Sequence, residues 1–140
     1  MTTISGELRQ RVAERAAGRC EYCHLPQACQ VATFPVGHIL PRCLGGKTEL
    51  SNLASACPRC NATKWTHIVG RDPATGDKVE LFDPRRHVWN DHFAWAPTEP
   101  ERLESETAIG RATIVLLELN APRRLEIRRW LISVAKRPSE

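Results

Sequence analysis

The amino-acid sequence predicts an α+β fold, in which short strands and one short helix form a small core between longer helices. Three observations lead to this prediction. Two Cys-x-x-Cys pairs, Cys20/Cys23 and Cys57/Cys60, bracket residues 24–56. Runs that favour strands lie between these pairs. Apolar residues recur at helical spacing near both ends of the chain.

The first predicted element is a helix over residues 6–17. Ser5 is suited to cap its amino end, because a serine oxygen accepts a hydrogen bond from a backbone N–H that has no partner within the helix. Leu8, Val12 and Ala16 recur every four residues and give the helix one apolar stripe. We therefore expect this helix to pack on the core through that stripe.

A strand, a loop and a second strand are predicted between the cysteine pairs. Residues 30–36 are rich in Val, Thr and Phe, and the strand is predicted to extend to Pro41. A loop over residues 41–51 follows, and residues 52–56 predict the second strand. Pro58 suits the first position of a short helix, where its missing N–H costs nothing.

The second half of the chain predicts further strands and helices. Residues 72–76 have a turn composition, and residues 78–82 a strand composition. The aromatic-rich segment 88–95 is expected to pack on the core. Two helices are predicted at the end of the chain, over residues 107–119 and 122–135.

The composition is that of a globular protein. The chain has 140 residues, of which 41% are hydrophobic and 26% charged. We expect one domain over residues 1–140, with a core over about 19–66 and a hairpin and helical extension over about 67–136. No apolar run reaches the roughly 18 residues of a membrane helix, and residues 1–10 lack a signal-peptide core, so a cytoplasmic location is expected. The net charge of +4 favours an anionic partner such as nucleic acid.

The spacing of the four paired cysteines predicts a structural zinc ion. Thiolates at positions i and i+3 bind one ion together, and two such pairs complete a tetrahedron with no position left for water. Reduced core cysteines or a redox pair are the alternatives. Cys29 and Cys43 are expected to be small buried apolar residues.

His38 and Asn61 suggest phosphodiester chemistry. Hydrolysis needs a base that activates water and a cation that stabilises the leaving group. A neutral imidazole suits the base at physiological pH, and an amide oxygen suits Mg²⁺. Taken singly, a histidine at the end of a strand is more often structural, and Asn61 could simply satisfy backbone groups near the helix.

The ordered set of motifs resembles the HNH endonuclease family. The matching segments are residues 20–23, 37–41, 45–46, 52–53 and 57–61, together with Lys64. Segments 70–76, 81–85, 92–95 and 109–112 resemble a bacterial subgroup of that family. The resemblance implies a ββα-metal core clamped by zinc and an activity on DNA. It implies that His38 is the general base, that Asn52 orders the loop and orients the imidazole, and that Asn61 binds a catalytic Mg²⁺ or Mn²⁺.

One position departs from the family pattern. Gly37 stands where the family has the Asp or Glu that is the main anionic ligand of the catalytic metal. Another carboxylate could replace it, with Glu49, Asp72 and Asp91 as candidates. His67 could also serve, with a softer metal such as Mn²⁺ or Ni²⁺. Otherwise the domain binds nucleic acid without cutting it efficiently.

Positively charged residues near the predicted site are candidates for binding nucleic acid: Arg42, Lys47, Arg59 and Lys64. Lys64 could instead lie on the helix surface. The arginines of the last helix, Arg123, Arg124, Arg128 and Arg129, are expected either to contact phosphates or to form a solvated face. His87 and His92 lie among aromatic residues and are expected to have packing roles.

Three functions remain open at this point: a DNA endonuclease, a zinc module that only binds nucleic acid, and a protein-interaction domain. The third leaves His38 and Asn61 unexplained. The oligomeric state is open.

Overall fold

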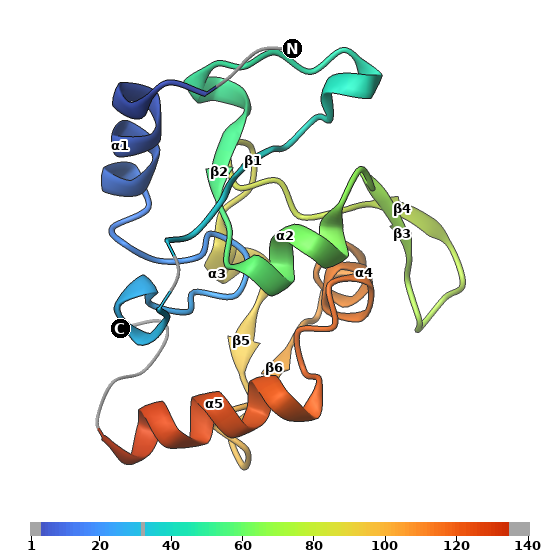
Figure 1. Cartoon of the computed structure of the whole chain (residues 1–140). Coiled ribbons are helices and arrows are strands. Elements are labelled where there is room, and N and C mark those ends of the chain that lie inside the picture. Colours follow the sequence, from blue (N-terminus) through green and yellow to red (C-terminus); the bar gives the residue numbers. More distant parts are fainter. Residues whose placement is uncertain (1–3, 32, 135–140) are drawn as a thin grey trace.

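The computed structural model describes residues 4–31 and 33–134 of the chain (Figure 1). The helices and strands are α1 (Gly6–Arg15), β1 (Val36–His38), β2 (Leu53–Ser55), α2 (Pro58–Lys64), β3 (Val69–Arg71), β4 (Lys78–Glu80), α3 (Trp89–His92), β5 (Ala94–Trp95), β6 (Leu103–Glu104), α4 (Ala108–Leu116) and α5 (Pro122–Ser133). Within these described ranges the strands form three separate antiparallel pairs, β1–β2, β3–β4 and β5–β6. This mixture of helices and small sheets confirms the predicted α+β class.

The unit that positions the candidate site is β1, β2 and α2. β1 and β2 pair antiparallel, with His38 opposite Leu53. α2 begins three residues after β2, with Pro58 in its first turn as predicted. α1 packs beside β2: Val12 is fully buried, and the Arg15 guanidinium donates hydrogen bonds to the Leu50 and Leu53 carbonyls.

The predicted strand, residues 30–36 extended to Pro41, is correct only over Val36–His38. A strand needs a partner, and β2 offers one only to the segment that begins at Val36. The preceding residues are held differently, since the Phe34 N–H donates to the Gln27 side-chain oxygen at 3.0 Å. Val31 is fully exposed. Residue 32 lies outside the described part of the chain.

Other predicted boundaries were close. The Ser5 oxygen accepts from the Leu8 N–H, as expected of the cap of α1. β4 ends earlier than predicted, because the Phe82 N–H donates to the Thr113 hydroxyl of α4 and not to a strand. α5 begins at Pro122 as predicted. Ala135, its predicted last residue, lies outside the described residues.

The core joins the metal-binding cysteines to the rest of the molecule. The four paired cysteines belong to one buried cluster with Phe82, Phe93, Leu103, Leu117 and Leu119. The segment 88–95 packs on this cluster as predicted. Among the described residues, none of the helices has the length and apolar character that crossing a lipid bilayer requires.

Candidate functional site

The four paired cysteines form a metal centre. Cys20, Cys23, Cys57 and Cys60 are buried, and their sulfur atoms all lie within 4.8 Å of one another. The Cys23 and Cys57 sulfurs are 3.7 Å apart. Tetrahedral zinc, with Zn–S bonds of about 2.3 Å, puts neighbouring sulfurs roughly 3.8 Å apart. Donor type, number and spacing therefore fit zinc, as the sequence predicted.

Backbone N–H groups of the two cysteine pairs point at two of these sulfurs. The Cys23 N–H points at the Cys20 sulfur at 3.5 Å, and the Cys60 N–H points at the Cys57 sulfur at 3.4 Å. A zinc ion with four thiolates carries a net charge of −2, so these N–H groups stabilise the sulfurs that bear the negative charge.

Two arginines of α5 also face this centre, which corrects both sequence-based expectations for them. Arg124 and Arg128 are buried, so they neither form a solvated face nor lie where they could contact phosphates. The Arg124 Nη1 lies 3.3 Å from the Cys60 sulfur and 3.9 Å from the Cys57 sulfur. Burial works to lower the pKa of Arg124, but the nearby cysteine sulfurs outweigh it and raise that pKa. Four thiolates around a zinc ion would carry a net charge of −2, and the buried Arg124 guanidinium offsets part of that charge.

Arg128 is held by other partners. Its Nη1 donates to the Glu101 carbonyl at 3.0 Å, and its guanidinium lies 5.5 Å from the centre of the Trp95 ring. The remaining arginines of α5 are exposed, and Arg129 pairs with Glu101 at 2.8 Å. Cys43 is exposed and Cys29 half-buried, so the expectation that both are buried is wrong.

The candidate base, His38, is the last residue of β1. Its Nε2 lies 2.8 Å from the Thr48 hydroxyl oxygen, across the loop that connects the two strands. Burial, and then the positive charge of Arg42, lower the pKa of His38 below its usual value. The imidazole is therefore neutral at pH 7, the state in which it accepts a proton.

The loop itself is held by Asn52. Its side-chain oxygen accepts from the Leu40 N–H at 2.8 Å, and its amide donates to the Leu40 and Lys47 carbonyls at 3.0 and 2.9 Å. Gly46 permits this arrangement, since a Cβ there would lie 1.7 Å from the Leu40 oxygen and 2.9 Å from the Asn52 amide nitrogen. Asn52 thus orders the loop, while the contact to the His38 ring comes from Thr48.

Position 37 faces Asn61. A Cβ added to Gly37 would lie 3.0 Å from the Asn61 side-chain oxygen, so a side chain at 37 would begin beside that candidate ligand. Asn61 is exposed on α2. Among the described residues, the four cysteines form the only group of three or more His, Cys, Asp or Glu side chains placed to hold an ion. The side chains present therefore fit a hard catalytic cation only in part.

The candidate replacements for the missing carboxylate differ in their surroundings. Asp72 is fully buried, and the Arg111 guanidinium binds both of its oxygens at 2.9 and 2.8 Å. This pairing makes Asp72 unsuited to a metal at Asn61. Glu49 and Asp91 are exposed, as is His67, whose ring centre lies 6.0 Å from that of Trp65.

The four candidate nucleic-acid-binding residues differ in burial and in their partners. Lys64 is buried, and its ammonium donates to the Ile39 carbonyl at 2.9 Å, so it joins α2 to the segment after His38. Arg59 is exposed and forms an ion pair with Glu118. Arg42 and Lys47 are exposed on the loop between β1 and β2.

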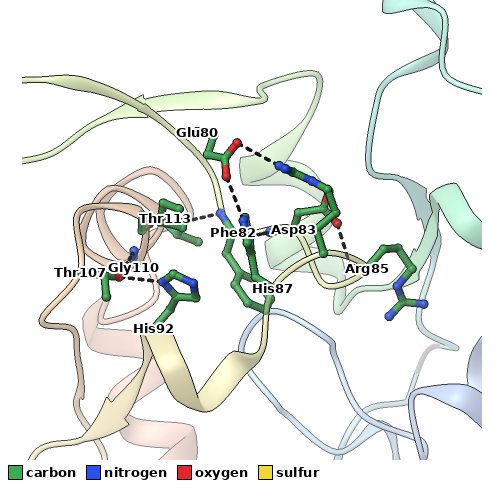
Figure 2. A network of polar contacts seen from close by, with 11 residues as sticks. Glu80, Phe82, Asp83, Arg85, His87, His92, Thr107, Gly110 and Thr113 are labelled. Carbon is green, nitrogen blue, oxygen red and sulfur yellow. Dashed lines mark hydrogen bonds and ion pairs between the residues drawn. The ribbon is translucent and has the colours of Figure 1, made fainter.

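Figure 2 shows the polar network around His87 and His92. The His87 Nδ1 accepts from the Asp83 N–H at 2.9 Å, and its Nε2 lies 2.8 Å from the Glu80 carboxylate. The His92 Nδ1 lies 2.8 Å from the Thr107 hydroxyl at the start of α4. Both imidazoles have structural partners, in keeping with the predicted packing roles.

A four-cysteine metal centre that holds two antiparallel strands and a helix, with a histidine on the first strand and an asparagine on the helix, defines a zinc-clamped ββα-metal domain. Residues 20–66 match the family model described as HNH endonuclease, so this part of the chain is an HNH domain.

The match to a curated relative extends further along the chain. Over 127 residues, 89% of this chain, it is 25% identical to the Septu protein PtuB of Bacillus thuringiensis. The chain spans 46% of the length of that relative. No solved structure matches the chain.

Sequence reasoning missed two residues of the site. Thr48 carried no signal, because its contact depends on how the loop folds back on His38. For Arg124 the sequence held a weak signal. Leu125 and Leu131 predict which side of α5 is buried. Arg124 and Arg128, four residues apart, flank that side.

Proposed function

We propose that the chain is a metal-dependent endonuclease that hydrolyses DNA phosphodiester bonds, with His38 as general base and Asn61 as a ligand of the catalytic divalent cation, Mg²⁺ or Mn²⁺. The observation that carries the proposal is the strand–strand–helix unit held by the cysteines. In this unit the strand that ends in His38 runs past Asn61. A Cβ added to Gly37 would lie 3.0 Å from the Asn61 side-chain oxygen.

The proton transfer follows from the surroundings of His38. The reaction uses the tautomer with the proton on Nε2, in which Nε2–H donates to the Thr48 hydroxyl oxygen and the Nδ1 lone pair accepts from water. Nδ1 takes a proton from water as the water oxygen bonds to phosphorus. The P–O bond to the leaving sugar oxygen breaks, and that oxygen takes a proton from solvent. When bound, a divalent cation stabilises the charge that develops on the leaving oxygen.

A second candidate function is supported by Gly37. Gly37 provides no carboxylate beside Asn61, and a hard cation that has Asn61 as its one protein ligand depends on water and substrate phosphate for the others and binds weakly. In this alternative the domain binds nucleic acid through cations such as Arg42 and Lys47 without efficient cleavage. Such binding weakens steeply as salt concentration rises.

Incubation of the purified chain with supercoiled plasmid under Mg²⁺, Mn²⁺ and Ni²⁺ separates the two functions. We expect cleavage by the parent chain and none by His38→Ala, with zinc content and circular dichroism unchanged. Cleavage that persists in the variant removes His38 from the mechanism. If neither protein cuts, a salt-titrated binding assay distinguishes a nucleic-acid-binding module from a protein-interaction domain.

Gly37→Glu is expected to raise divalent-dependent cleavage by about tenfold or more, since it adds a carboxylate beside Asn61. Gly37 does not have a positive φ, so the backbone accepts a side chain there. The exposed Asn61 amide has to shift slightly to make room. Gly37→Gln is the matched control, because it adds the same bulk without charge. Equal rates for the two variants would contradict this account of position 37.

A further inference from the structure

An exposed tryptophan directly follows the helix that carries Asn61. Trp65 is 72% exposed, the largest exposed aromatic surface among the described residues. Its N–H donates to the Asn61 carbonyl at 3.1 Å, so it lies one helical turn beyond Asn61. A large apolar ring left in water next to the proposed cutting site contributes nothing to the core.

The backbone at Trp65 is also strained. Its φ of 44° and ψ of −122° match the second residue of a type II′ turn, and the Lys64 carbonyl accepts the His67 N–H at 2.8 Å across that turn. Glycine is the residue favoured at this position, because a side chain there costs free energy. Strain of this kind clusters at active sites and ligand contacts.

The surroundings of Trp65 fit a nucleic-acid ligand. Arg42 and Lys47 are exposed on the loop beside His38, and the charge of Arg42 acts on that imidazole. The Lys64 ammonium donates to the Ile39 carbonyl, which ties the end of α2 before Trp65 to the segment between His38 and Arg42. Proteins bind unpaired nucleotides by combining exposed cations, which meet phosphates, with an exposed aromatic ring, which meets a base. Trp130, 59% exposed on α5, lies within a regular helix and lacks the strained backbone.

We propose that the Trp65 indole stacks on an unpaired base of the substrate next to the cleaved phosphodiester. The inference rests on the proposed function and names its substrate class: single-stranded or locally melted DNA. A base within an intact duplex is stacked on both faces and offers none to a side chain. The chain therefore prefers single strands, or duplexes with unpaired bases, over perfect duplex.

The test measures the affinity of the zinc-loaded chain, in a His38→Ala background that prevents cutting, for a fluorescein-labelled single strand and its perfect duplex. Trp65→Ala should weaken single-strand binding about tenfold or more and leave duplex binding unchanged, and Trp65→Phe should retain most of the affinity. Trp130→Ala is the matched control and should change neither. Unchanged single-strand affinity in Trp65→Ala overturns the proposal.

Trp65→Gly separates stacking from a structural role. Because glycine accepts this backbone conformation, the variant should raise the melting temperature while it weakens single-strand binding. A lower melting temperature together with weaker binding would make Trp65 a structural residue. If Trp65→Ala changes the oligomeric state in sedimentation and leaves DNA affinity unchanged, the ring belongs to a protein contact. If the parent chain binds single strands through Trp65 but cuts no substrate, the nuclease function alone is refuted. If the parent chain cuts DNA and Trp65→Ala binds and cuts single strands equally well, only the stacking is refuted.

Discussion

The protonation of His38 is set by its neighbours, and this gives a pH prediction at the scale of single residues. Burial and the positive charge of Arg42 hold the pKa of His38 below 6.5. Since a general base acts in its neutral form, cleavage should rise with pH through this pKa and reach a plateau by about pH 7. Arg42→Ala removes one of the two effects, so the midpoint of the rise should move to higher pH.

The measurement is kcat/KM for plasmid cleavage across the pH range, with Lys47→Ala as control. Lys47 is an exposed cation of the same loop, but it is not among the causes of the lowered pKa of His38, so its removal should leave the midpoint in place. A midpoint that stays fixed in Arg42→Ala, or falls, would contradict the electrostatic account of His38.

Residues whose role is local were predictable from sequence. The cysteine pairs place their sulfurs by i, i+3 spacing, whereas the loop role of Asn52 was implied only by the family resemblance. Thr48 and Arg124 were not predictable, because each meets its partner only after the chain has folded. Arg124 reaches the Cys60 sulfur from 64 residues further along the chain.

At the scale of elements, α5 is part of the metal centre through Arg124, whose Nη2 also donates to the Leu117 carbonyl at 2.9 Å. Replacing a partner in the shell around metal ligands typically lowers metal affinity 10–100-fold. We therefore expect Arg124→Met to weaken zinc binding by about that much, as measured by competition with a chromophoric chelator. Arg123→Met changes an exposed neighbour on the same helix and should have no effect. Equal zinc affinities in the two variants would show that α5 packs near the centre without stabilising it.

Helices were predicted better than strands for a physical reason. A helix satisfies its own hydrogen bonds, so its cap and apolar spacing identify it, as Ser5 and Val12 do for α1. A strand depends on a partner elsewhere in the chain. Residues 30–36 have strand composition, but the ladder with β2 begins only at Val36.

At the scale of the whole molecule, the metal centre lies inside the core. The four cysteines share one buried cluster with Leu117 and Leu119, residues at the end of and just after α4. In Figure 1, α5 lies across the bottom of the view, below β5 and β6. Its Arg124 reaches the Cys60 sulfur of the metal centre at 3.3 Å. The HNH domain and the remainder of the described chain thus depend on the same packed residues.

Removal of zinc is therefore expected to unfold the whole described chain and not the domain at residues 20–66 alone. Zinc bound by four thiolates contributes roughly 10–16 kcal/mol, comparable to the total stability of a domain, about 5–15 kcal/mol. Titration with a strong chelator should give one cooperative transition, with loss of helical circular dichroism from α4 and α5 together with loss of the ββα unit. Reloading with Zn²⁺ should reverse it. Two separate transitions, or helices that survive chelation, would mean that the C-terminal half holds together without the metal, and that Leu117 and Leu119 form a core of their own.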